Sequence, residues 1–230
     1  MGELNYKKIQ YYEKMKKRRR NTFIVSSILV ISIILSIGYY IFYRENDKSK
    51  YLLNMGAGNY KIKVLKGELE EYEKQLNINE IDYKWNGTLE EGNEPTDLVF
   101  HHTASNTISP EDINKMHIQE GWEGIGYHFY IRKDGTIYRG RPENTIGAHA
   151  IGRNRNSIGI CLEGNFETEV PTEEQKNSLV KVSTDMIIKY NLEGIIGHKD
   201  VFETLCPGKN FPMEEIKNRV LEEQLKMVND

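Results

Sequence analysis

The chain has 230 residues, 38% of them hydrophobic and 28% charged, with a formal net charge of -3. This composition excludes a disordered or fibrous protein, and two cysteines, Cys161 and Cys206, are too few for the disulfide framework of a small secreted scaffold, although they allow one bridge. Residues 1–43 carry 8 Lys or Arg and 2 acids, which leaves 23 basic and 32 acidic residues elsewhere. The acidic remainder argues against a nucleic-acid partner, because phosphates require a basic surface.

The first predicted element is the apolar stretch at residues 22–43, which contains no charged side chain. Its length is sufficient for a helix that crosses the roughly 30 Å hydrocarbon core of a bilayer. The basic sequence KMKKRRR at residues 14–20 precedes it and favours a cytoplasmic N-terminus. A cleaved signal peptide is the alternative, but its apolar region is usually about 7–15 residues long and ends at a small-residue cleavage site. We therefore expect a cytoplasmic tail over residues 1–21 and a single transmembrane helix over residues 22–43, with the lipid bilayer as a partner.

Residues 44–82 are polar and predict a stalk or linker that is partly helical. Gly56 and Gly58 indicate a flexible break, and apolar residues then recur at a helical spacing: Ile62, Leu65, Leu69, Tyr72 and Leu76. This apolar stripe covers about two heptads, fewer than a coiled coil needs. Two interpretations remain, a helix that lies on the folded domain and a helix that forms a homodimer.

Strand and helix patterns alternate from residue 83 to residue 230, which we expect to form the folded domain. The strands are predicted at residues 97–103, in a hairpin around a Lys-Asp-Gly turn at 126–141, at 157–166 and at 193–198. The helices are predicted at residues 109–121, from Thr172 to Tyr190, and at 212–228. This order predicts an α/β fold, a mixed central β-sheet flanked by helices.

Histidine and cysteine side chains in this domain are candidate metal ligands. Adjacent residues on a strand point to opposite faces, so His101 and His102 cannot both reach one centre. His198 follows a short strand and Cys206 ends an irregular segment, so a loop can bring this pair to one point. One strand histidine and this pair make three ligands, the open coordination of catalytic zinc. The spacing alone also permits a buried thiol without a ligand role or a cysteine nucleophile.

Four segments of the domain, in order and spacing, resemble the N-acetylmuramoyl-L-alanine amidase family, which includes phage lysozymes that are amidases and animal peptidoglycan recognition proteins. The segments are LVFHHTAS, GWEGIGYHFYIRKDGTIYRGR, TIGAHAIGRNRNSIGICLEGNF and GHKDVFETLCPGKNF. The resemblance extends from Trp85 to Phe211 and does not cover the predicted anchor or stalk. It implies a zinc-dependent amidase domain.

The resemblance also implies roles for individual residues. Zinc (Zn2+) would be held by His101, the first residue of the HH pair, together with His198 and Cys206. Tyr127 looks like the catalytic tyrosine of the family. Thr204 occupies the position where phage members have a lysine and many active recognition proteins have a threonine, and its catalytic role would be a hydrogen bond without a positive charge.

The remaining histidines have weaker expected roles. His149 and His102 are the candidate substrate-binding residues. His149 lies in the glycine-rich segment GAHA, and members of the family often have this loop near the ligand. His117 lies on a helical stripe with Met116 and is expected to be structural. His128 is expected to point away from the face of its neighbour Tyr127 and has no chemical role.

Glu163 lies two residues after Cys161, on the same face of its strand. It is either a second-shell partner of the metal site or a buried acid bonded to the backbone. The sequence does not separate these two interpretations.

The predicted function is a membrane-anchored zinc hydrolase that cleaves the amide bond between N-acetylmuramic acid and L-alanine in peptidoglycan. The expected location is the cell membrane, with one membrane span, a cytoplasmic N-terminus and the amidase domain facing the cell wall. The alternative is a non-catalytic peptidoglycan-binding module of the same fold. The presence of His101, His198, Cys206 and Tyr127 favours the enzyme, because binding alone does not require a metal.

Overall fold

The computed structural model describes Met15 and residues 69–229. The predicted transmembrane helix at residues 22–43, the rest of the predicted cytoplasmic tail and the predicted stalk up to residue 68 lie outside the described residues. Within the part of the chain that is described, no helix is both long enough and apolar enough to cross a bilayer.

A five-stranded mixed sheet with the strand order β3-β2-β4-β1-β5 forms the centre of the domain. Its strands are β1 (Asp97–His102), β2 (Phe129–Ile131), β3 (Ile137–Arg139), β4 (Ser157–Leu162) and β5 (Gly194–Gly197). The neighbouring strands pair in parallel except for β2 and β3, which form the predicted antiparallel hairpin. Because β4 is buried along its whole length, its sequence is a nearly continuous apolar run rather than an alternating one. The predicted mixed sheet is confirmed.

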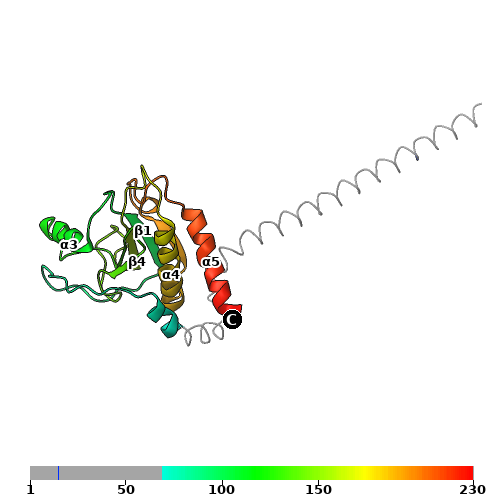
Figure 1. Ribbon diagram of the computed structural model, residues 1–230, viewed down its shortest axis with the longest axis horizontal. Coiled ribbons are helices and arrows are strands. Elements are labelled where there is room, and N and C mark those ends of the chain that lie inside the picture. The colour runs from blue at the N-terminus through cyan, green and yellow to red at the C-terminus, as the bar shows by residue number, and fades with distance from the viewer. Residues whose placement is uncertain (1–14, 16–68, 230) are drawn as a thin grey trace, which may run out of the picture. The chain divides into compact units, whose positions relative to one another are not determined.

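Three helices cover the two faces of this sheet. Figure 1 shows α4 (Glu173–Tyr190) and α5 (Met213–Asn229) on one side of β1 and β4, and α3 (Pro110–Gln119) on the other. The predicted N-caps are present at α3 and α4. The Ser109 side chain accepts a hydrogen bond from the Asp112 N–H at the start of α3, and Thr172 with Gln175 forms a capping box at the start of α4.

The main hydrophobic core lies between the sheet and α4 and α5. Alternate residues of the central strands, such as Leu98 and Phe100 of β1, belong to it and have no exposed surface. A smaller cluster on the opposite face contains Tyr130 and Cys161 and packs against Ile113 of α3. His101 alternates with Phe100 along β1, so it lies on the face with the smaller cluster.

Residues 69–82, which include the last part of the predicted stalk, lie on this domain. Residues 69–75 are helical, and Leu69 packs against Ile188 while Leu76 joins the main core. Asn79 then pairs with β3 through backbone hydrogen bonds to Ile137 and Arg139. The described part of the apolar stripe therefore follows the first interpretation, a helix on the domain, and the homodimer stays a prediction for residues 44–68.

The buried face of α3 contains Asn114 in place of the expected Met116. Ile113, Asn114 and His117 are buried, whereas Met116 is 41% exposed. The side chain of Asn114 is buried because it bridges two loops: it donates to the Lys84 carbonyl and accepts from the Ile125 N–H. A polar residue can replace an apolar one on a buried helix face when its hydrogen bonds are satisfied.

Candidate metal centre

His101, His198 and Cys206 lie together at one edge of the sheet. His101 is near the carboxyl end of β1, and His198 opens the short 3-10 helix η1 (His198–Asp200) directly after β5. Because β1 and β5 are parallel neighbours, their carboxyl ends meet at the same edge, and the two imidazole ring centres are 4.7 Å apart. A hydrogen bond from the Lys199 N–H to the Cys206 carbonyl closes the following loop. The three candidate ligand atoms all lie within 4.8 Å of one another.

The geometry of these three donors fits a zinc ion. The Sγ atom of Cys206 lies 3.6 Å from Nδ1 of His101. Tetrahedral zinc, with metal–sulfur and metal–nitrogen bonds of about 2.3 and 2.0–2.1 Å, separates two such ligand atoms by about 3.5 Å. The backbone N–H of His102 lies 3.4 Å from the same sulfur and donates to it. Two imidazoles and one thiolate are a donor set that zinc prefers, and they leave its fourth position open.

Burial keeps the three donors uncharged in the metal-free protein. It lowers the pKa of His101 well below its ordinary value, with a further contribution from His198, and it also lowers the pKa of His198. Neutral imidazoles carry the lone pair that a metal needs. Burial raises the pKa of the Cys206 thiol to about 12, although the His102 N–H opposes this shift. A metal bound here must therefore displace the thiol proton.

Tyr127 lies beside the candidate ligands, with its ring centre 5.1 Å from that of His101. It lies two residues before β2, directly after Gly126. A Cβ atom on Gly126 would lie 2.0 Å from the Ala148 carbonyl oxygen, so only glycine lets these two backbone segments come this close. Burial raises the pKa of the Tyr127 hydroxyl, and the nearby Cys161 contributes to the shift. The hydroxyl therefore keeps its proton and can donate a hydrogen bond.

Thr204 lies on the loop that carries the cysteine. Its Oγ1 atom accepts a hydrogen bond of 3.2 Å from the Cys206 N–H. The side chain thus stabilises the turn that presents the thiol, and its own hydroxyl proton is not used by this bond.

The two candidate substrate-binding histidines make protein contacts. The His102 ring accepts a hydrogen bond at Nδ1 from the Phe166 N–H, so it supports the loop after β4 from the opposite face of β1. His149 is 7% exposed, and its Nδ1 lies 3.0 Å from Nε2 of His101. It therefore contacts a candidate metal ligand directly.

His117 has the expected structural role, but it also supports the tyrosine. Its Nδ1 accepts a hydrogen bond of 3.0 Å from the Gly126 N–H, and its ring centre is 5.7 Å from that of Tyr127. The indole of Trp122 also packs on this imidazole, with ring centres 4.5 Å apart. His117 holds the turn before Tyr127 in place.

His128, for which the sequence indicated no chemical role, is buried and bonded to the backbone. It accepts from the Gly159 N–H and donates to the Thr145 carbonyl, each at 3.0 Å. Tyr127 and His128 both precede β2, and their ring centres lie 6.5 and 5.7 Å from that of His149.

Glu163 is a buried acid bonded to the backbone, one of its two predicted roles. Its carboxylate accepts from the N–H groups of Ile108 and Lys133 at 3.2 and 3.0 Å. Cys161 and Cys206 are both free thiols, so the one disulfide that the sequence allows does not form.

Ser157 is a residue near the site that the sequence analysis missed. It lies in the first position of β4, and its Oγ is 3.4 Å from Nε2 of His149. A serine at the start of an apolar strand has no distinctive pattern, so only the fold reveals this contact.

Comparisons with known proteins agree with this arrangement. Residues 91–209 match the family described as N-acetylmuramoyl-L-alanine amidase. The chain is 35% identical over 124 residues to the endolysin of Escherichia phage T7, an alignment that covers 50% of this chain and 82% of the endolysin.

Solved structures show the same fold. An endolysin N-acetylmuramoyl-L-alanine amidase, LysCS from Clostridium intestinale URNW, superposes with a TM-score of 0.61 at 51% identity and covers 62% of this chain and 94% of its own. A peptidoglycan recognition protein, LE, solved in complex with tracheal cytotoxin, a monomeric peptidoglycan of the diaminopimelic acid type, superposes with a TM-score of 0.55 at 27% identity and covers 62% of this chain and 93% of its own.

Proposed function

Because the chain belongs to the N-acetylmuramoyl-L-alanine amidase family and is an enzyme of that activity, we propose that it acts as a membrane-anchored zinc hydrolase of peptidoglycan. The bond it would cleave joins the lactyl group of N-acetylmuramic acid to L-alanine. The observation that carries the zinc proposal is the convergence of His101, His198 and Cys206 within 4.8 Å, next to Tyr127.

His101, His198 and Cys206 would hold the ion. When bound there, zinc would supply a water activated at neutral pH and a Lewis acid for the substrate carbonyl. The protein supplies the remaining stabilisation. Tyr127, which keeps its proton, would donate a hydrogen bond to the oxygen that becomes negative in the transition state. Thr204 would hold the cysteine loop and donate its unused hydroxyl proton to the substrate.

The surroundings of the donors support a large wall fragment as the substrate. Phe202 and Leu205, on the loop between His198 and Cys206, are 44% and 70% exposed, and the Phe202 ring stacks on His198 with centres 5.6 Å apart. These two side chains offer apolar contact area for a substrate beside the donors. The related recognition protein that was solved with a monomeric peptidoglycan supports the same substrate class.

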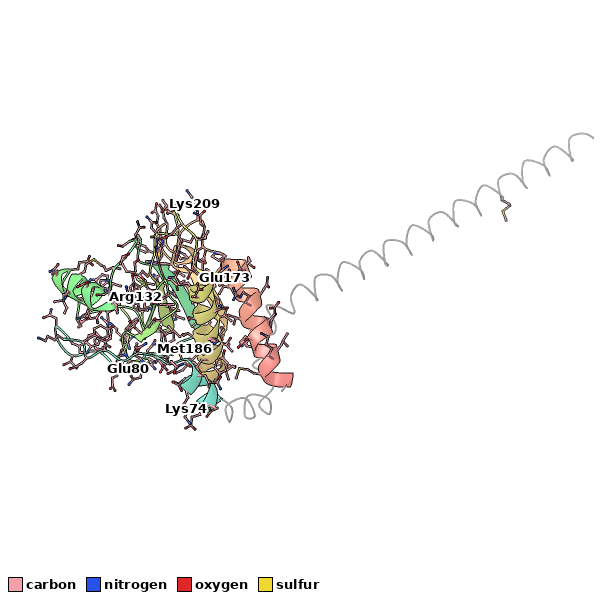
Figure 2. All side chains as sticks on the ribbon, viewed as in Figure 1. Lys74, Glu80, Arg132, Glu173, Met186 and Lys209 are labelled. Carbon is pink, nitrogen blue, oxygen red and sulfur yellow. The ribbon has the colours of Figure 1, made fainter. Side chains whose placement is uncertain are left out.

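The anchor at residues 22–43 would restrict the enzyme to wall strands near the membrane, with the N-terminus in the cytoplasm and the catalytic domain facing the wall. The arrangement of the domain is compatible with this role. Figure 2 shows Lys74, close to the first described residues of the domain, at the end opposite Lys209, which is three residues beyond Cys206. A tether attached there would leave the metal loop free to reach the wall.

Mass spectrometry of muropeptides tests the bond that is cut. Purified full-length chain, loaded with zinc, should release free stem peptides that begin with L-alanine and leave glycan strands with intact muramic acid. Products cut within the glycan or within the peptide would overturn the amidase proposal.

The anchor needs a separate test. The full chain should sediment with membranes and resist extraction by high salt, whereas a chain without residues 1–44 should be released. Protease applied outside intact cells or spheroplasts should digest the catalytic domain. Salt-extractable full-length protein would contradict the anchor without affecting the amidase proposal.

A further inference from the structure

The imidazole of His149 is enclosed in a slot that two glycines create. A Cβ atom on Gly147 would lie 2.4 Å from the ring, and one on Gly159, in the middle of β4, would lie 2.6 Å from it. Neither distance is possible for real side chains, so this ring position requires glycine at both places. The ring thus lies directly against the sheet, beside the strand that carries His101.

The backbone at His149 is fixed as well. The side-chain carbonyl of Asn154 accepts hydrogen bonds from the N–H groups of His149 and Ala150, each at 2.8 Å. The Gly147 N–H donates to the Asn154 carbonyl at 2.9 Å. Because backbone and ring are both held, the position of the His149 nitrogens is set by the fold.

A chain of hydrogen bonds runs from the backbone through His149 to His101. The Ser157 hydroxyl donates to the Arg153 carbonyl at 2.7 Å, and a carbonyl can only accept. The hydroxyl proton is therefore used, and Ser157 Oγ accepts from Nε2 of His149 at 3.4 Å. The proton of the neutral His149 ring is then on Nε2, and its Nδ1 is a bare acceptor.

This acceptor determines the proton position on His101. Nε2 of His101 lies 3.0 Å from Nδ1 of His149, so it must carry the His101 proton. The lone pair of His101 is then on Nδ1, the atom that lies 3.6 Å from Cys206 Sγ. A proton on Nδ1 would block the metal-binding atom, and two bare nitrogens would face each other between the histidines.

We propose that His149, oriented by Ser157, is a positioning residue that fixes the tautomer and ring orientation of His101 for metal binding. This inference rests on the proposed zinc function. It differs from the sequence-based expectation that His149 contacts the substrate. Histidine ligands commonly donate their second N–H to a partner, and loss of that partner typically lowers metal affinity 10- to 100-fold.

The wild-type protein itself provides the first test. Long-range 1H–15N spectra of the metal-free, 15N-labelled full chain should show the proton on Nε2 in both His101 and His149. The same spectra of Ser157→Ala should show the tautomer of His149 no longer fixed. A proton on Nδ1 of His101 in the wild-type protein would overturn the proposal.

Zinc affinity, measured by competition with a chromophoric chelator, provides the second test. His149→Leu, which removes the acceptor but fills the slot, should bind zinc 10- to 100-fold more weakly. His149→Asn keeps an acceptor oxygen near the position of Nδ1 and should recover most of the affinity. His117→Asn, a buried histidine outside the chain of hydrogen bonds, should bind zinc as the wild type does.

The outcomes separate the possible roles. A higher KM of His149→Leu with unchanged zinc affinity would indicate a substrate contact and overturn the proposal. Equal losses of zinc affinity in His149→Leu and His117→Asn would also overturn it, because the loss would then reflect a general disturbance of the fold. If the wild-type chain binds no zinc, the proposed zinc function fails, while the spectra still report on the tautomer.

Discussion

The Sγ atom of Cys206 lies 3.6 Å from Nδ1 of His101, although 104 residues separate these two in the chain. This separation suits two ligands of one zinc ion. The pair therefore provides the first prediction.

Cys206→Ser should lose both zinc and amidase activity, because serine does not supply the thiolate that zinc binds strongly. The loss of zinc affinity should exceed the roughly 100-fold that outer-shell changes cause. Metal analysis of the purified proteins checks this. Cys161→Ala is the matched control for metal content, since it removes the other thiol and leaves all three donors in place. A wild-type chain that keeps full activity after complete chelation would exclude the metal mechanism.

Tyr127→Phe should retain zinc and the fold but lose most of its turnover. The ring packing against His101 stays, and only the hydroxyl donor is removed. Loss of one such donor to a developing oxyanion lowers kcat by roughly 100- to 1,000-fold. Steady-state kinetics on a soluble muropeptide, with zinc content measured in parallel, checks this. A normal kcat in the variant would exclude a catalytic role for the hydroxyl.

Thr204→Val should lower activity by about 5-fold, the value of one hydrogen bond of roughly 1 kcal/mol. Valine has nearly the same shape but cannot accept from the Cys206 N–H. Thr204→Ser keeps the hydroxyl and should remain close to the wild type. An unchanged kcat in the valine variant would exclude a role for the hydroxyl.

Asp185→Asn should stabilise the protein at neutral pH but not in acid. Asp185 of α4 has no exposed surface, and neither carboxylate oxygen has a hydrogen-bond partner among the described residues. Burial, helped by the nearby Glu73, raises its pKa from 3.8 to about 7. The folded state therefore resists ionisation of this group, and the cost appears as the pH rises from about 4 to 7 and remains above that range.

The expected gain of Asp185→Asn above pH 7 is a few kcal/mol, since each pKa unit corresponds to about 1.4 kcal/mol. Thermal unfolding of both proteins at several pH values, with zinc held constant, checks this. The curves of Tm against pH should converge near pH 4 and separate up to pH 7. A separation that is independent of pH would contradict the raised pKa.

The sequence alone predicted the elements of the fold and the three candidate ligands, His101, His198 and Cys206, that the structure brings together. Capping residues fixed the start of α3 and α4, because the local hydrogen bonds of Ser109 and Thr172 need no tertiary partner. Alternation along β1 separated His101 from His102, because successive side chains of a strand point to opposite faces. The family resemblance supplied the proposed role of Tyr127, which no periodicity reveals.

Only the tertiary structure decided how the site is supported. The sequence placed His149 among the candidate substrate-binding residues and did not reveal its contact with His101. The parallel pairing of β1 with β4 places Gly159 opposite Val99, two residues before His101, and leaves room for the His149 ring against the sheet. Likewise, Leu76 is part of the core rather than of a free stalk, because Asn79, three residues later, pairs with Tyr138 of β3. Contacts between residues distant in sequence depend on strand order and register, and a pattern of neighbouring residues does not contain that information.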